Sequence, residues 1–383
     1  MKGKINILVY GATGSIGDSL FSIIRKNKNR FNVKGITCFR NTKKLIKLAK
    51  EFNVKSLGSD CGYLDNYNLN KKFSYQGINN FKKMITDQVD VIIFAISGLD
   101  ALGLSIEIAK SGKKVGLANK ECIISLGRRF ISIAKKNNTD IVPLDSEHNS
   151  IYRLIKNVKS NFTSITITAS GGPFLNKDKK YLKTVTPKQA IRHPIWKMGR
   201  KISVDSATLM NKALEIIEAK YLFNLKTEKI NAVLHPESII HASINYKDGS
   251  SICLLSEPDM KISISSLFDN ISTDALKKNI FENLKTKNLN LSKISKKKYP
   301  AINLVYKVLK IGGIAPHLFN YNNEILVKKF LQKEIKFLDI VLFNEKTINK
   351  YFKKFNNTHN PSISEINKSC EWVNNNIYLG KRN

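Results

Sequence analysis

The start of the chain carries the pattern that most restricts its fold: two short apolar runs separated by a glycine-rich turn and an amphipathic stretch. Residues 5–10 predict a strand, GATGSIG at 11–17 a turn, 18–26 a helix and 33–38 a second strand. Strand, crossover helix and strand form the repeating unit of a parallel sheet that is covered by helices on both faces. We therefore predict an α/β protein that begins with a Rossmann-like, doubly wound parallel sheet. Further strands of this sheet are predicted at 89–96, 114–118 and 140–143.

The pattern changes after Ser164, where short strands and tight turns replace the alternation of strands and helices. Apolar strands at 232–234, 241–246 and 251–255, with an Asp248-Gly249 turn before the last, predict a mostly antiparallel sheet with helices. The polar, Lys/Asn-rich stretch 269–298 is interpreted as a linker. The remainder is helical by pattern, with apolar residues at helical spacing and breaks at Gly312-Gly313 and Pro316. The apolar positions of these helices are Leu304, Val308, Leu326, Phe330, Ile340 and Leu342.

The chain is strongly basic, with 64 Lys and Arg against 30 Asp and Glu in 383 residues, a formal net charge of +34. Such an excess is typical of proteins that bind nucleic acids or anionic membranes. Here the Lys residues are spread over the whole length together with many Asn and Ile, which indicates a compositional bias, so we predict no specific nucleic-acid partner. No apolar run approaches the ~20 residues that cross a bilayer, so no membrane partner is predicted. The five cysteines are odd in number and lack C-x-x-C spacing, which predicts reduced thiols and a cytoplasmic protein.

The glycine turn predicts a nucleotide site. Gly11, Gly14 and Gly17 lie between the first strand and the first helix, where glycine lets the backbone approach a pyrophosphate at the helix N-terminus. At the end of the second strand, Arg40 stands where a carboxylate that binds a ribose diol is usual. A guanidinium can bind a 2′-phosphate with two hydrogen bonds, which favours NADP over NAD, although an ordinary surface arginine is the alternative.

Carboxylates predict a metal site. Asp145 and Glu147 follow the strand at 140–143, and in extended chain residues two apart point to the same side. With Glu215 they would form an oxygen-only ligand set that suits Mg²⁺ or Mn²⁺. The alternative for Asp-Ser-Glu is a helix-capping sequence. His148, next to them, is interpreted as a structural histidine.

The segment 193–218 combines residue types that suit a phosphate and metal pocket. Ser206 stands where a helix cap would be expected, and Asn211, Lys212 and Glu215 would lie on adjoining turns of the helix that follows. The alternative is a Ser-capped surface helix with an exposed Lys212–Glu215 pair, which would contribute little to stability.

Taken together, these motifs resemble the 1-deoxy-D-xylulose 5-phosphate reductoisomerase family, in order and over nearly the whole chain. The matching segments are GATGSIG, ANKE at 118–121, LDSEHN at 144–149, SGGPF at 170–174, the stretch 192–215, HPESIIH at 235–241 and GSSICLLSEPDM at 249–260. The resemblance implies NADPH- and divalent-metal-dependent conversion of 1-deoxy-D-xylulose 5-phosphate to 2-C-methyl-D-erythritol 4-phosphate, in the non-mevalonate isoprenoid pathway. It also implies a homodimer with a four-helix bundle at the C-terminus of each chain. The predicted parts are an NADPH-binding domain (1–150), a catalytic domain (151–268) with a lid at 190–200, the linker (269–298) and a C-terminal helical domain (299–383).

The resemblance also implies roles for individual residues. The implied metal ligands are Asp145, Glu147 and Glu215. The implied substrate-binding residues, some of which hold the phosphate, are Ser146, Glu147, Ser170, His193, Trp196, Ser206, Asn211, Lys212 and Glu215. Lys120, Glu147 and His193 are the implied catalytic residues. The implied cofactor contacts are Thr13, Gly14, Ser15, Ile16, Arg40, Asn41, Asn119, Glu121 and Gly199. Phe39 departs from the family, which commonly has a small residue before the basic one.

Two other classes of protein share some of these features. A semialdehyde-type NADP-dependent dehydrogenase would have the same N-terminal fold and would use Cys122, the cysteine nearest the predicted cleft, without a metal. The three carboxylates argue against it. A nucleic-acid-binding protein would use the +34 charge, but the sequence has no aromatic-basic motif of a known binding fold.

Overall fold

The computed structural model describes residues 3–61, 64, 73–158, 161–196, 199–268, 280 and 288–380. These residues form two compact units. Unit 1 comprises Met1–Cys122, Phe130–Tyr152 and Asp259–Glu282, and unit 2 comprises Ile123–Arg129, Arg153–Pro258 and Asn283–Asn383. Residues 269–279 and 281–287 of the predicted linker, and Lys197 and Met198 of the predicted lid, lie outside the described residues. The domain boundaries proposed from the sequence stay a prediction.

Unit 1 is built on a parallel sheet whose strands follow the order β4-β3-β2-β1-β5-β6-β7, which confirms the doubly wound α/β fold. Strands β2 to β4 are added on one side of β1, and the chain then returns so that β5 pairs with the other side of β1. Its described strands are β1 (Ile5–Tyr10), β2 (Phe31–Cys38), β3 (Ser56–Ser59), β4 (Phe73–Gln76), β5 (Val91–Phe94), β6 (Lys114–Leu117) and β7 (Asp140–Pro143). Neither β3 nor β4 was predicted from the sequence. The strand β3 reads SLGS, a sequence too short and too poor in β-branched residues to be recognised.

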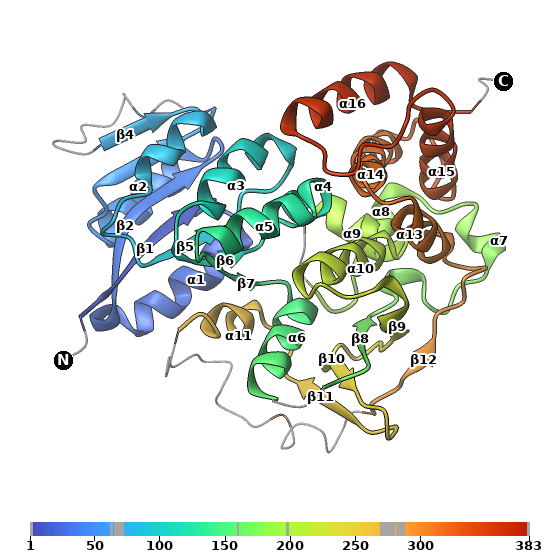
Figure 1. Cartoon of the computed structure of the whole chain (residues 1–383), viewed down its shortest axis with the longest axis horizontal. Coiled ribbons are helices and arrows are strands. Elements are labelled where there is room, and N and C mark those ends of the chain that lie inside the picture. Colours follow the sequence, from blue (N-terminus) through green and yellow to red (C-terminus); the bar gives the residue numbers. More distant parts are fainter. Residues whose placement is uncertain are drawn as a thin grey trace. The chain divides into compact units, whose positions relative to one another are not determined.

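Helices follow most of these strands. They are α1 (Ser15–Lys26), α2 (Thr42–Glu51), α3 (Leu102–Ala109), α4 (Lys120–Leu126), α5 (Arg128–Lys136), α6 (Ser146–Asn157) and α11 (Met260–Ser265), with short 3₁₀ turns η1 (Lys28–Arg30), η2 (Ile78–Met84) and η3 (Leu99–Ala101). In Figure 1, α1 and α11 lie side by side on one face of the sheet, which their direct contacts confirm. Leu20 and Phe21 of α1 are buried in one cluster with Ile7 and Val9 of β1 and with Phe268. Residues 259–268 therefore complete the core of unit 1.

Unit 2 contains a second sheet with the order β11-β10-β8-β9-β12. Only β8 and β9 are parallel, and the other pairings are antiparallel, which confirms the predicted mostly antiparallel sheet. Its described strands are β8 (Ser164–Ala169), β9 (Ile230–Leu234), β10 (Ile240–Asn245), β11 (Ser251–Leu255) and β12 (Ser292–Lys293). The strand β12 lies at the end of the stretch that was interpreted as a linker, and it pairs with β9.

Helices make up the rest of unit 2. The central ones are α7 (Lys179–Leu182), α8 (Pro187–Ala190), α9 (Arg200–Ala207) and α10 (Met210–Leu222), with 3₁₀ turns η4 (Gly172–Phe174) and η5 (Thr227–Lys229). The C-terminal ones are α13 (Pro300–Ile311), α14 (Ala315–Leu331), α15 (Asp339–Phe352) and α16 (Ile363–Asn376), which confirms the predicted helical C-terminus and its break at Gly312 (Figure 1). Leu342 is an error of the periodic pattern, because it is 45% exposed while its neighbours Val341 and Phe343 are buried.

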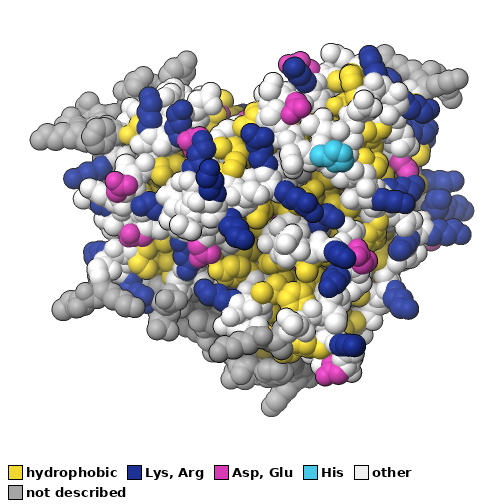
Figure 2. Space-filling model, in the orientation of Figure 1, with side chains coloured by type: hydrophobic (Ala, Val, Ile, Leu, Met, Phe, Trp, Pro, Cys, Tyr) yellow, Lys and Arg dark blue, Asp and Glu magenta, His cyan; other side chains and the backbone are white. Residues whose placement is uncertain are grey.

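Figure 2 shows Lys and Arg side chains scattered over the visible face with hydrophobic side chains between them. This distribution fits the interpretation of the charge as a compositional bias. Among the described residues, no helix is both long enough and apolar enough to span a membrane.

Candidate active site

The glycine turn of unit 1 follows β1 and leads into α1. Gly11 has a φ of +85°, and a Cβ atom there would lie 2.4 Å from the carbonyl oxygen of Ala95, so only glycine fits. Gly17 is equally restricted, since its Cβ would lie 2.1 Å from the carbonyl oxygen of Ala12. The helix begins with Gly14 as its N-cap, a residue with no side chain to occupy the helix N-terminus. The turn therefore brings backbone N–H groups and the positive end of the helix dipole to a place where a pyrophosphate can bind.

Hydrogen bonds fix this turn against the end of β2. The Ala12 amide donates to the carbonyl oxygen of Thr37 at 2.8 Å, and the Gly11 amide donates to the Thr37 hydroxyl at 3.1 Å. From α2, the Lys44 ammonium donates to the Thr13 carbonyl at 3.0 Å and pairs with Asp18. Of the predicted cofactor contacts, Thr13, Gly14, Ser15 and Ile16 lie in this turn and in the first turn of α1.

Arg40 and Asn41 follow β2 directly. The Asn41 side chain accepts a hydrogen bond from the Lys44 amide at 3.1 Å and caps α2, which gives this residue a structural role. Arg40 is exposed, and its guanidinium lies 5.9 Å from the centre of the Phe39 ring. An exposed guanidinium at this end of the sheet suits a 2′-phosphate.

Asn119 and Glu121 follow β6 at the same end of the sheet. The Asn119 side chain is 1% exposed and donates to the carbonyl oxygens of Ile96 at 2.7 Å and Gly98 at 3.2 Å. Its oxygen accepts from the Cys122 amide at 2.8 Å, so Asn119 joins the loop after β5 to the start of α4. Gly199, the remaining predicted cofactor contact, is in unit 2 as the N-cap of α9.

Cys122 is fully buried, and its thiol lies 3.1 Å from the Asn119 carbonyl oxygen. A catalytic cysteine needs an accessible sulfur, preferably beside a base or a cation. The geometry of Cys122 therefore counts against the dehydrogenase alternative.

The carboxylates of unit 1 lie where β7 gives way to α6. The sheet strand ends at Pro143 and the helix begins at Ser146, so Asp145 precedes the helix and Glu147 lies in its first turn. The argument from extended chain was wrong on this point, because helical geometry begins within the Asp-Ser-Glu sequence. Lys120 contacts Asp145 through an ion pair of 2.9 Å, and both side chains are mostly buried. His148 is fully buried, and its interpretation as a structural histidine stays a prediction.

In unit 2, Ser170 and His193 form a hydrogen-bonded pair 3.0 Å apart. The His193 Nδ1 atom accepts from the backbone amides of Ile195 at 3.2 Å and Trp196 at 2.9 Å, so the ring carries its proton on Nε2 and donates it to the Ser170 hydroxyl. Partial burial lowers the pKa of His193 to about 4, which makes the ring neutral at physiological pH. This histidine therefore both shapes the 193–196 loop and orients the serine.

The structure corrects the expected cap at Ser206. Ser206 lies inside α9, and α10 begins four residues later at Met210. The chain turns between the two helices at Leu209, which has a φ of +56°, a conformation rare for a residue other than glycine. The loop after β8 packs closely on this region, since a Cβ on Gly172 would lie 2.9 Å from the Ser206 carbonyl oxygen. Ser170 and Ser206, both predicted phosphate contacts, are therefore on adjoining segments.

The start of α10 holds the other predicted substrate contacts of unit 2. Lys212 and Glu215 form an ion pair with side chains only 3% and 1% exposed, and the Asn211 amide also donates to Glu215. The alternative of an exposed surface pair is therefore wrong. Burying a lysine and a glutamate costs free energy unless they are paired, and such residues are often functional.

Sequence reasoning missed the residues that hold α9 in place. Asp205 is 1% exposed, accepts a hydrogen bond from Asn323 of α14 at 2.8 Å and pairs with Lys201 at 3.1 Å. The sequence FNYNNE of α14 could have indicated a buried polar contact, because asparagines are unusual on the buried face of a helix.

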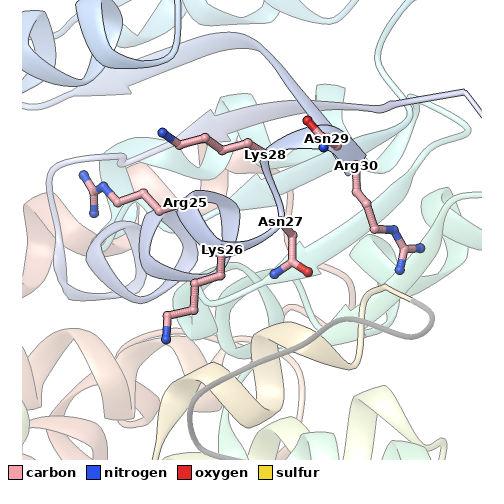
Figure 3. Close-up of a pocket in the computed structure, with 6 residues that line it drawn as sticks. All are labelled: Arg25, Lys26, Asn27, Lys28, Asn29 and Arg30. Carbon is pink, nitrogen blue, oxygen red and sulfur yellow. The ribbon is translucent and has the colours of Figure 1, made fainter.

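One basic hollow of about 470 Å³ lies away from these residues, lined by Arg25–Arg30 at the end of α1. Figure 3 shows its side chains pointing in different directions, and Arg25 pairs with Glu51 at 2.5 Å. Because the cations do not converge, this hollow is a poor candidate for a specific phosphate site.

Unit 1 has a parallel sheet and a glycine turn that leads into a helix without a side-chain cap, and unit 2 has buried ionisable residues. These features define the class of dinucleotide-binding oxidoreductases with an added substrate domain. Three protein-family models match the chain. The model of 1-deoxy-D-xylulose 5-phosphate reductoisomerase matches residues 7–127, and two models of its C-terminal domains match residues 141–223 and 255–375. The chain belongs to the 1-deoxy-D-xylulose 5-phosphate reductoisomerase family.

Relatives support this membership over the full length. The 1-deoxy-D-xylulose 5-phosphate reductoisomerase of Clostridium botulinum is 36% identical over 98% of this chain and 99% of its own, and that of Clostridium tetani is 38% identical over 91% and 93%. The Zymomonas mobilis enzyme, solved with NADPH, has a TM-score of 0.87 at 33% identity and covers 98% of both chains. A structure of DOX-P reductoisomerase with NADPH, fosmidomycin and magnesium has a TM-score of 0.86 at 32% identity and covers 97% of both chains.

Proposed function

We propose that this protein converts 1-deoxy-D-xylulose 5-phosphate to 2-C-methyl-D-erythritol 4-phosphate with NADPH and a divalent cation, Mg²⁺ or Mn²⁺. The observation that carries the proposal is the full-length match to the family. The buried Lys212–Glu215 pair supports it, because buried ionisable residues are common at functional sites. A bound cation polarises substrate oxygens so that the carbon skeleton can rearrange, and the reduced nicotinamide provides the hydride for the final reduction.

The carboxylates fit a hard divalent cation. Asp145, Glu147 and Glu215 offer only oxygen donors, which is the set that Mg²⁺ and Mn²⁺ prefer. We propose that these three residues share one cation. Lys120 already neutralises part of the charge of Asp145, and we propose that it also contacts the hydroxyl groups of the substrate together with Ser146.

A second set of residues suits the substrate phosphate. Ser170, Ser206, Asn211 and Lys212 combine hydroxyl, amide and ammonium donors, the groups that bind phosphate oxygens. The neutral His193 donates a hydrogen bond through its Nε2–H group to the Ser170 oxygen. The hydroxyl hydrogen of Ser170 therefore stays available to donate to the phosphate. Binding energy at the phosphate can be used to orient the reacting carbons, which lie several bonds away. We propose that Trp196, whose amide is held by His193, excludes water from the same pocket.

The glycine turn fits a dinucleotide, because side chains at Gly11 and Gly17 would collide with the backbone while Gly14 leaves the helix end open. We propose that Arg40 binds the 2′-phosphate and thereby selects NADPH over NADH.

We also propose that the protein is a homodimer that acts in the cytoplasm. The strand β11 lies at one edge of the described sheet, and Ile252 on it is 42% exposed. An outer strand with unpaired backbone groups and an apolar side chain is suited to pair with a second copy of the chain. Sedimentation of the wild-type chain and of Ile252→Lys tests this, and a monomeric wild type would contradict it.

The oxidation of NADPH, followed by its absorbance with 1-deoxy-D-xylulose 5-phosphate as substrate, tests the whole proposal. After chelation the chain should be inactive, and added Mn²⁺ or Mg²⁺ should restore turnover. Turnover that persists in chelator and disappears in Cys122→Ser would instead support the dehydrogenase alternative.

A further inference from the structure

The side chain of Phe39 is exposed at the end of β2. It is 56% exposed, and among the described residues of unit 1 it is the one large hydrophobic side chain that is exposed to such a degree. A single exposed apolar residue is common on protein surfaces and does not by itself indicate a site. What sets Phe39 apart is the way its backbone and its neighbours are held.

Three hydrogen bonds fix the backbone of Phe39. Its carbonyl oxygen accepts from the amides of Asp60 at 3.1 Å and Cys61 at 2.8 Å, and from the Ser59 hydroxyl at 3.4 Å. These donors belong to the end of β3 and the turn that follows it, so the residue after β2 is tied to the neighbouring strand. The backbone that carries the exposed ring is therefore fixed at the carboxyl end of the sheet.

The cation that follows Phe39 is held beside the ring. The Arg40 guanidinium lies 5.9 Å from the ring centre, and the Arg40 carbonyl oxygen accepts from the Thr42 amide at 2.9 Å at the start of α2. A guanidinium at this distance from an aromatic ring is within the range of a cation–π contact. The exposed ring of Phe39 and the guanidinium of Arg40, which can bind a phosphate, therefore lie side by side.

The position of this pair relative to the glycine turn is also fixed. Thr37, two residues before Phe39, binds the amides of Gly11 and Ala12. In a sheet of this type the pyrophosphate of a dinucleotide binds at the turn, and its adenosine extends toward the end of β2. Phe39 and Arg40 stand where the adenine ring and the ribose 2′-phosphate would be.

We propose that Phe39 is a stacking platform for the adenine base of NADPH, and that it works with Arg40 as a two-part clamp on the adenosine 2′-phosphate. This inference rests on the proposed use of NADPH. Stacking of a base on an aromatic side chain needs no hydrogen-bond pattern, and the planar guanidinium is suited to the phosphate oxygens. The clamp divides recognition in two: Phe39 contributes to the binding of any adenine dinucleotide, whereas Arg40 contributes only when the 2′-phosphate is present.

Calorimetric titration of the full-length chain with 2′-phospho-ADP-ribose, a probe without the nicotinamide, tests the platform separately from catalysis. Phe39→Ala should weaken binding about tenfold, in the range expected for the loss of one base–aromatic stack. Phe39→Trp should keep the affinity, and the new indole fluorescence should be quenched by the probe. Phe355→Ala is the matched control, because Phe355 is also an exposed phenylalanine, at 38%, but belongs to unit 2. Its affinity should equal that of the wild type.

A second titration with ADP-ribose, which lacks the 2′-phosphate, separates the two parts of the clamp. Phe39→Ala should lower the affinity for both probes by a similar factor, while Arg40→Ala should lower it only for the 2′-phosphorylated one. Unchanged or tighter binding by Phe39→Ala would overturn the platform and leave the proposed function intact. A wild-type chain that binds neither probe would contradict the proposed cofactor itself, and the platform with it.

Discussion

Replacing Lys212 with alanine gives the sharpest test of the structure of α10. Lys212 and Glu215 are 3% and 1% exposed, so the replacement would leave a buried carboxylate without its cationic partner. Breaking a buried ion pair in this way costs about 3–5 kcal/mol of unfolding free energy, whereas an exposed pair contributes about 0–1 kcal/mol. The Asn211 amide would still donate to Glu215, so we expect a loss near the lower figure, about 3 kcal/mol.

Two measurements on Lys212→Ala separate its structural role from its role in binding. Urea unfolding at neutral pH measures the loss of stability, and Lys212→Met with Glu215→Gln should recover part of it, since the double variant buries no unpaired charge. Steady-state kinetics should show a strongly raised KM for the sugar phosphate and a lower kcat/KM, with NADPH affinity nearly unchanged.

Lys353→Ala is the control for the general loss of positive charge, because Lys353 is an exposed lysine at the C-cap of α15. Both variants are compared at the same ionic strength, which keeps screening equal. A stability loss under about 1 kcal/mol would refute the buried-pair argument. Equal KM values in Lys212→Ala and Lys353→Ala would refute the assignment of Lys212 to the phosphate.

Three further changes have defined outcomes. Asp145→Asn removes one charge from the proposed metal site, so turnover should need a much higher Mn²⁺ concentration, and normal activity at unchanged Mn²⁺ would contradict the ligand assignment. Arg40→Ala should lose about 1.5–3 kcal/mol of NADPH affinity with little change for NADH, and equal losses for both would show that Arg40 does not bind the phosphate. His317 is fully buried, and burial lowers its pKa to about 3, so the unfolded chain binds a proton that the folded chain does not. Its contribution makes stability fall as the pH drops from about 6.5 toward 3, and urea unfolding of His317→Gln should show a shallower decline in that window than the wild type.

The fold of unit 1 could be predicted because its signals are local. The strand β1 matches the predicted 5–10, and β7 matches 140–143, since each is a buried apolar run bounded by turn residues. The strands β3 and β4 could not be predicted, because each depends on pairing with a neighbour more than on its own residues. The membership of residues 259–268 in the core of unit 1 depends on contacts distant in sequence, such as Phe31 with Phe268 at a ring separation of 4.9 Å.

The chemistry of the candidate site could be predicted further than its geometry. Residue types such as the carboxylates of Asp145 and Glu147 restrict the possible ligands by themselves, whatever the backbone does between them. The backbone was predicted less well where a single residue changes the path of the chain. Leu209 has a positive φ and separates α9 from α10 where a single helix start was expected. A leucine in a sequence gives no indication of this conformation. The conformation holds because buried partners fix both helices, among them Asp205, which Asn323 binds from α14. Candidate ligand-binding residues can therefore be proposed from a sequence through their chemistry, whereas residues that position them are identified only once segments distant in sequence have been brought together.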